Sequence, residues 1–188
     1  MKLMKCLLPL CLLGALLAGC GSSDSAPSSA PAASSAVVDS TAPADSAPAA
    51  DEPNTAALDA AVAAIEQVNP VANPRAIDDF SLENEMGVTM DNIVAFKGDV
   101  TNDQADCALV FVAQVKDGTA DAVVGELSAY QAALAGNDLY VEFADKVAKA
   151  QDARIMAQSN YVAMVIAGVN GPDYSEIDTV LQSALGGL

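Results

Sequence analysis

The chain contains no histidine and no tryptophan among its 188 residues, and it has only 8 basic residues against 25 acidic ones. Without imidazole there can be no serine–histidine–aspartate or cysteine–histidine pair, no histidine zinc site and no proximal haem histidine. The formal charge of −17 also disfavours nucleic acid, because that binding draws most of its affinity from lysine and arginine. The sequence therefore predicts no nucleic-acid partner and no basic patch for anionic lipid.

The N-terminus has one short apolar run, residues 6–17, behind two lysines. As a helix this run would cover about 18 Å, less than the ~30 Å hydrocarbon core, so it is typical of a secretory signal peptide. It leads into a Leu-Ala-Gly-Cys tetrapeptide at residues 17–20 that resembles the bacterial lipobox. The resemblance implies that residues 1–19 are cleaved, that Cys20 carries a thioether-linked diacylglycerol and that its new amino terminus can be acylated.

Such an anchor predicts an extracytoplasmic protein that is held on the cell membrane by lipid without crossing it. Loss of the leader removes two lysines and lowers the formal charge from −17 to −19. It also leaves Cys107 as the one free thiol, so no intramolecular disulfide is expected. Residues 20–54 are rich in alanine, serine and proline and carry five acids, a composition that predicts a disordered tether.

Residues 55–188 predict a single globular domain, since 134 residues are enough for one hydrophobic core. The fold class is α+β, with a mostly antiparallel four-stranded sheet, about four helices and the order α-β-β-α-α-β-β-α. Gly98 is expected to end the first strand, and Ser159-Asn160 to form a tight hairpin turn. Helices are expected to begin at Thr55, Thr119, shortly after Asn137 and at Pro172, and strands to span 92–97, 108–115, 153–158 and 161–167.

Two stretches carry a family resemblance: ALVFVAQVKDGT at 108–119 and SNYVAMVI at 159–166. Together with the acylated tether they resemble bacterial lipoproteins that contain domain of unknown function 4358, over about residues 55–170. The resemblance implies a surface lipoprotein of the clostridial type of Gram-positive cell. It brings no established activity and no catalytic residues. The Tyr-Pro-like element usual before the hairpin is not evident within residues 138–153.

The segment after the first predicted strand is a candidate calcium loop. Asp99, Thr101, Asp103 and Asp106 have the alternating spacing by which a tight loop offers oxygen ligands to Ca²⁺. The segment lacks the central glycine and the bidentate glutamate of an EF-hand, so it is not one. The other interpretation is a solvated acidic loop. No other cofactor is predicted besides the covalent lipid.

A second acidic cluster contains Asp78, Asp79, Glu83 and Glu85. Paired carboxylates can act as acid and base in glycoside hydrolysis. In a domain this acidic, however, clusters also arise from composition alone. The sequence has no nucleophile elbow, Walker loop, dinucleotide fingerprint or CxxC pair, so enzymatic activity has no positive support.

The two arginines, Arg75 and Arg154, and the aromatic Tyr161 are weaker candidates for binding. An arginine fork could recognise a carboxylate or sugar acid, although an internal ion pair is the alternative in so acidic a domain. Tyr161 could edge a binding surface or belong to the core. Cys107 is interpreted as a small buried apolar residue rather than a reactive thiol.

These observations predict a lipid-anchored accessory module that binds a basic envelope protein, a wall polymer or a small ligand. The alternatives are a carboxylate-dependent hydrolase of cell-wall or surface glycans and a purely structural role at the envelope surface. An enzyme needs a cleft with a carboxylate of raised pKa, whereas a binding module needs an exposed apolar or aromatic patch.

Overall fold

The computed structural model describes residues 52–136 and 144–188. The described chain is α+β, as expected, with an antiparallel five-stranded sheet of order β1-β2-β3-β5-β4. Two short helical turns precede β2, a π turn at Ser81–Glu85 and a 3₁₀ turn at Met90–Asn92. The main elements are α1 (Thr55–Val68), β1 (Pro74–Ala76), β2 (Ile93–Thr101), β3 (Leu109–Val115), α2 (Ala120–Ala135), α3 (Ala144–Gln151), β4 (Arg154–Gln158), β5 (Tyr161–Ile166) and α4 (Tyr174–Gly186).

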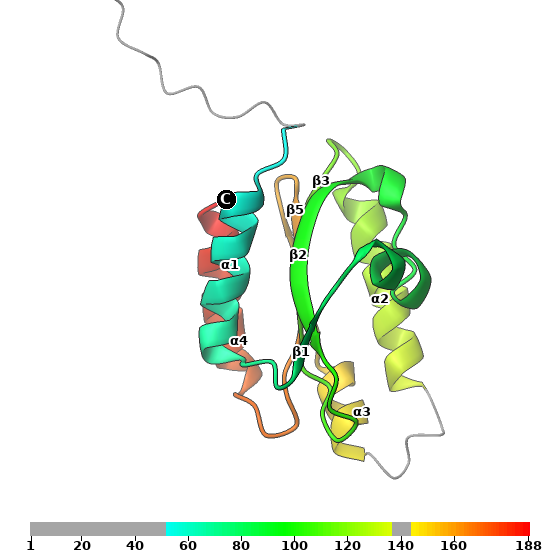
Figure 1. The fold of residues 1–188 in the computed structure, drawn as a ribbon, viewed down its shortest axis with the longest axis vertical. Helices are drawn as coiled ribbons and strands as arrows, with labels where there is room; N and C mark the ends of the chain where they lie inside the picture. Colours follow the sequence, from blue (N-terminus) through cyan, green and yellow to red (C-terminus); the bar gives the residue numbers. More distant parts are fainter. Residues whose placement is uncertain (1–51, 137–143) are drawn as a thin grey trace, which may run out of the picture. The chain divides into compact units, whose positions relative to one another are not determined.

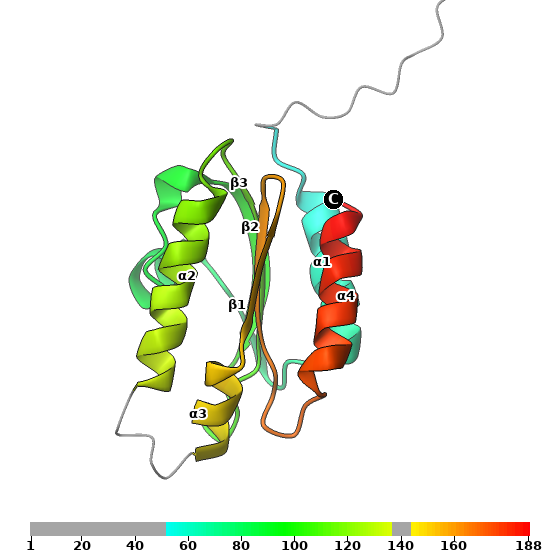
Figure 2. The ribbon, with the colours of Figure 1, turned by 180° about the vertical axis from the view of Figure 1, so that it is seen from behind.

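The sheet forms the middle layer of three (Figures 1 and 2), with α1 and α4 on one face and α2 and α3 on the other. Every residue of the central strands β3 and β5 is buried, so both strands are covered on both faces of the sheet. Alternate side chains of β3 divide between two cores. Val110 and Val112 pack towards α1 and α4, whereas Leu109 and Phe111 pack towards α2.

The expected number of four strands is wrong, because the sheet gains β1. This strand pairs Pro74, Arg75 and Ala76 with the last three residues of β2. Three residues are too few to show an alternating pattern, and a proline without a backbone N–H is found in sheets mainly at edges. The sequence predicts turns in this segment, because an alternating hydrophobic pattern cannot be recognised over only three residues.

Gly98 does not end a strand, contrary to expectation. β2 continues through it to Thr101, and a Cβ placed on Gly98 would lie 2.3 Å from the carbonyl oxygen of Val110 and 2.9 Å from the Cα of Phe111. Glycine is therefore needed here because the neighbouring strand approaches closely. As a result, Asp99 and Thr101 belong to the strand and not to the loop that was expected to hold them.

Most helix and turn predictions agree with the structure. Val123 and Leu127 of α2 are fully buried, and Ser159, with a φ of 53°, forms the expected tight turn between β4 and β5. α1 begins at Thr55, as expected, whereas α4 begins at Tyr174 rather than at Pro172. Only the C-terminal part of the helix expected after Asn137 is described, as α3.

Glu52 and Asn54 at the end of the expected tether are bonded to the folded domain. The side-chain amide of Gln114 donates to the carbonyl of Glu52 (3.0 Å), and its oxygen accepts from the backbone N–H of Asn54 (2.9 Å). These bonds hold the residues just before α1 against β3. The expected signal peptide, Cys20 and the tether up to residue 51 lie outside the described residues. Within the described ranges, no helix is long and apolar enough to span a bilayer.

Candidate functional site

A groove of about 600 Å³ lies at the outer edge of β2. Its floor is the segment 96–99 of that strand. Asp59 and Val62 of α1 form one wall, and residues 76–80, which follow β1, form the other. Because α1 covers one face of the sheet and the segment after β1 packs towards the other, the strand edge lies at the bottom between two layers.

The groove is strongly acidic. Four aspartates from three separate segments line it: Asp59, Asp78, Asp79 and Asp99. Lys97 is the one basic residue among its lining residues. The ammonium of Lys97 lies 3.1 Å from a carboxylate oxygen of Asp59, but both side chains are well exposed, 44% and 60%, so the pair is only weakly stabilising. The remaining carboxylates leave a negative field for a positively charged ligand.

An aromatic side chain stands beside these carboxylates. Phe80 is 65% exposed, the one large apolar side chain so exposed among the described residues. On the floor, Phe96 is half-buried and packs against Phe111 with 6.2 Å between ring centroids. Carboxylates next to an exposed ring form a surface suited to a cationic group on an apolar stem.

Glu66 of α1 lies near Asp99, although Glu66 itself is not among the residues that line the groove. The Oε1 atom of Glu66 is buried without a hydrogen-bond partner in the described structure, and burial first, then the neighbouring Asp99 carboxylate, raises the pKa of Glu66. The pKa of Asp78, on the opposite wall of the groove, is shifted in the other direction. Asp78 accepts hydrogen bonds from the backbone N–H (2.8 Å) and hydroxyl (2.7 Å) of Ser81, and these bonds lower its pKa.

The second predicted acidic cluster is divided by the fold. Asp78 and Asp79 line the groove, whereas Glu83 lines a different surface hollow. Glu85 instead pairs with Arg75, with 2.7 Å between its carboxylate oxygen and a guanidinium nitrogen. The two halves of the cluster therefore have different surroundings, and only the first half belongs to the groove.

The four candidate calcium ligands have separate hydrogen-bond partners. Thr101 donates to a backbone carbonyl (2.6 Å), Asp103 accepts a backbone N–H of its own loop (2.9 Å) and Asp106 accepts that of Val169 (2.7 Å). Asp99 faces α1 instead. Among the described residues no group of three or more acidic or thiol side chains is placed to hold a metal ion.

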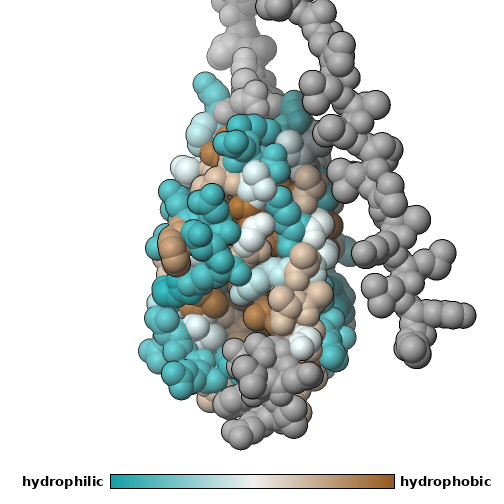
Figure 3. All heavy atoms as spheres, turned by 90° about the vertical axis from the view of Figure 1, so that its right-hand side faces the viewer, coloured by the Kyte–Doolittle hydropathy of each residue, from teal (hydrophilic) through white to brown (hydrophobic). Residues whose placement is uncertain are grey.

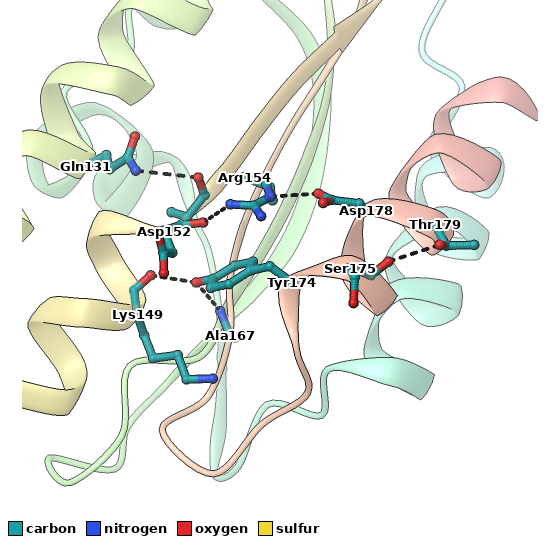
Figure 4. A network of polar contacts seen from close by, with 10 residues as sticks. Gln131, Lys149, Asp152, Arg154, Ala167, Tyr174, Ser175, Asp178 and Thr179 are labelled. Atoms are coloured by element: carbon teal, nitrogen blue, oxygen red, sulfur yellow. Dashed lines mark hydrogen bonds and ion pairs between the residues drawn. The ribbon is translucent and has the colours of Figure 1, made fainter.

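Both arginines form internal ion pairs, which confirms that interpretation of Arg75 and Arg154. The Nε of Arg154 donates to Asp178 (2.7 Å), and its guanidinium lies 4.5 Å from the ring centroid of Tyr174 (Figure 4). Tyr161 is 7% exposed and belongs to the core. These three candidates therefore serve the fold in the described structure.

The surroundings of Tyr174 join α3, β5 and α4 into one polar network. Its hydroxyl donates to the carbonyl of Lys149 and accepts the backbone N–H of Ala167 (3.1 Å; Figure 4). Burial raises the pKa of Tyr174 to about 12. The nearby amide of Gln131 donates to the carbonyls of Ala150 (3.1 Å) and Gln151 (2.9 Å) at the end of α3. Because these polar groups already bond to one another, the network positions the helices and leaves few hydrogen-bonding groups for a ligand.

A second, smaller cavity of about 160 Å³ lies near Cys107, with Tyr130 and Lys146 among its lining residues. Burial, and next the Asp106 carboxylate, raises the pKa of the Cys107 thiol to about 11, so the thiol stays protonated near neutral pH. This agrees with the expected unreactive cysteine.

The face to which α2 belongs shows hydrophilic residues with small apolar spots between them (Figure 3).

Sequence reasoning found Asp78, Asp79 and Asp99 but missed Asp59, Lys97, Phe80 and Glu66. The helical spacing of Asp59 and Glu66 places both on the Val62 side of α1, yet only the packing of that helix on β2 shows what they face. Phe80 directly after two aspartates was a usable signal, since it falls in a stretch with no apolar period.

No family model, no curated protein and no solved structure matches this chain.

Proposed function

We propose that this chain is a lipid-anchored accessory protein of the cell envelope, and that its domain binds a cationic partner in the acidic groove. The observation that carries the proposal is the meeting of four aspartates and the exposed Phe80 in one groove of about 600 Å³. Acylation of Cys20 and a tether over 20–54 would hold the domain outside the cytoplasm.

The field of the groove selects the class of partner. A net charge of −17 with a focused acidic groove raises the association rate of cations and repels anions, and both effects weaken as salt rises. Basic proteins or cationic envelope ligands therefore fit, whereas anionic polymers such as teichoic acids do not. An aromatic side chain beside the carboxylates adds apolar contact for the stem of a lysine or arginine.

A hexalysine peptide with blocked termini tests the groove directly. Asp78→Asn with Asp79→Asn should weaken its binding by about tenfold at low salt and flatten the salt dependence, because two carboxylates leave the site. The matched control is Asp117→Asn with Asp121→Asn, which removes the same charge from exposed positions outside the groove. The side-chain oxygen of an asparagine at position 78 can still accept the hydrogen bonds that Ser81 donates to Asp78. Equal losses in both double variants would contradict a specific groove.

The anchor is tested separately, by mass spectrometry of the mature N-terminus and by membrane fractionation of intact cells. We expect a chain that starts at Cys20 with a diacylglycerol mass on its sulfur, and a Cys20→Ser variant that loses the modification and leaves the membrane fraction. An unmodified Cys20 in a membrane-free protein would contradict the anchor and leave the groove proposal standing.

A second proposal is carboxylate-dependent hydrolysis of cell-wall or surface glycans, which one observation favours: Glu66 has a raised pKa beside Asp99. Glu66 is not among the residues that line the groove, however, and its Oε1 atom is buried, so the groove does not present this carboxyl group to a glycan. Binding is therefore the better-supported function. If peptidoglycan fragments were cleaved by the wild-type protein and not by Glu66→Gln, hydrolysis would replace it.

A further inference from the structure

The floor of the groove is an incompletely paired strand edge. β1 pairs with only the last three residues of β2, and one further bond runs from the N–H of Ile77 to the carbonyl of Gly98 (2.9 Å). In the described structure no backbone hydrogen bond reaches the same side of β2 before Gly98. Since backbone groups alternate between the two edges of a strand, the N–H and carbonyl of Phe96 point the same way as those of Gly98.

We propose that the partner binds as an added β-strand along Ala95–Lys97 of β2, after the β-bulge between Ile93 and Ala95, and that it is an extended basic segment of another protein. This inference rests on the proposed function and states how the cationic partner is held. Strand addition supplies affinity through backbone hydrogen bonds and specificity through alternate side chains. Phe96 and Lys97 of this open edge line the groove, between Asp59 on one wall and Phe80 on the other.

The alternation of β2 predicts the pattern of the segment. Lys97 and Asp99 point towards α1, because they contact Asp59 and Glu66. Phe96 packs into the core on the opposite face. An added strand would repeat this alternation, placing every second side chain near Asp59 and Asp99 on the α1 side and the others near Phe80, on the wall that also carries Asp78 and Asp79. The fitting segment therefore alternates basic and apolar residues.

Charge also decides between the occupants of this edge. A second copy of the chain would bring another acidic groove, at a formal charge of −17 per chain. The chain's own residues 21–54 contain five acids and no lysine or arginine. Both would place like charges against the aspartates, which costs affinity. A basic segment of a different protein neutralises them instead.

The test uses a blocked hexapeptide of alternating lysine and valine, binding to residues 20–188 with Cys20→Ser. Two analogues carry N-methyl groups on either the lysines or the valines, so each keeps the charge and blocks one backbone edge. We expect at least one analogue to bind about tenfold more weakly or worse. We also expect amide exchange at Phe96 to slow about tenfold with the parent peptide, while exchange at Phe111, in a central strand, stays unchanged.

The outcomes separate the two proposals. If both analogues bind like the parent and exchange at Phe96 is unaltered, strand addition is overturned, while groove binding stands as long as Asp78→Asn with Asp79→Asn still weakens binding. If no lysine-containing peptide binds saturably, the groove proposal fails together with this inference. Dimerisation of the free protein that slows exchange at Phe96 would assign the edge to a second copy and overturn the basic partner.

Discussion

The two edges of the sheet differ in the length of the outward-facing strand and in the side chains that stand beside it. β4 is a terminal strand of only five residues, paired with β5 on one side, and its first residue, Arg154, is held by Asp178 and by the Tyr174 ring. β2 has nine residues, and β1 covers only three of them. Short edge strands with engaged charged residues resist unwanted pairing. The comparison teaches that the open edge at β2 is a local feature, set among carboxylates.

Substitution at Gly98 should give the largest effect, because it separates β2 from the rest of the sheet. In Gly98→Ala the new Cβ would lie 2.3 Å from the carbonyl oxygen of Val110, and relief requires the backbone to move. We expect a loss of about 3 kcal/mol in the free energy of unfolding, measured by urea denaturation. Gly125→Ala, where the added Cβ meets nothing within 4 Å, should instead stabilise α2 by about 0.5–1 kcal/mol. Similar losses at both positions would contradict the close approach.

Removal of Arg154 should loosen the β4 edge by a smaller amount. Arg154→Gln loses the ion pair to Asp178 and the contact with Tyr174, and because its side chain is 36% exposed we expect about 1 kcal/mol. A double-mutant cycle with Asp178→Asn isolates the ion pair. If Arg154→Gln and Asp178→Asn were strictly additive, the pair would contribute nothing and the β4 edge would be held by packing alone.

Glu66→Gln should change how stability depends on pH. The pKa of Glu66 is raised in the folded protein, so below the unfolded pKa of about 4.5 ionisation of Glu66 costs the folded state nothing. As pH rises from there through the folded pKa, the unfolded chain releases its proton first and stability falls. Glu66→Gln removes that fall, so its advantage over wild type should appear above pH 4.5 and vanish below it. Parallel stability curves of wild type and variant between pH 3 and 7 would contradict the raised pKa.

Phe80→Ser should have the smallest effect on stability and a clear effect on binding. A side chain that is 65% exposed contributes little to the core, so the free energy of unfolding should change by less than about 0.5 kcal/mol. Binding of the lysine–valine peptide should weaken several-fold. The half-buried Phe96 is the contrast: Phe96→Ser should cost about 2 kcal/mol. A strongly destabilised Phe80→Ser would show that the ring supports the fold rather than a ligand.

Local pattern was enough where one element alone decides the outcome. The apolar spacing of Val123 and Leu127 predicts the buried face of α2, and the apolar run at 108–115, interrupted only by Gln114, predicts a strand buried on both faces. The charge of an internal arginine in an acidic domain predicts its ion pair. Such inferences succeed because side-chain direction repeats with a fixed period along a helix or a strand.

The same reasoning failed where two distant segments meet. Gly98 looks like a strand end because glycine ends many strands, but its role is set by the approach of Val110 and Phe111 on β3. Asp99 looks like part of a loop because a glycine precedes it. The three-residue β1 has no pattern of its own and exists because the end of β2 offers it hydrogen bonds.

The sequence by itself determined the α+β class, the positions of most helices and strands, and the acidic character that favours a cationic partner. These follow from composition and from periodicities that each segment carries alone. Only the tertiary structure decided that Asp59 and Asp99 share a groove with Asp78 and Phe80, that Glu66 meets Asp99, and that part of β2 lies open on its floor. The physical reason is that these contacts join three separate elements, and their register is set by packing against the sheet, which no local pattern encodes.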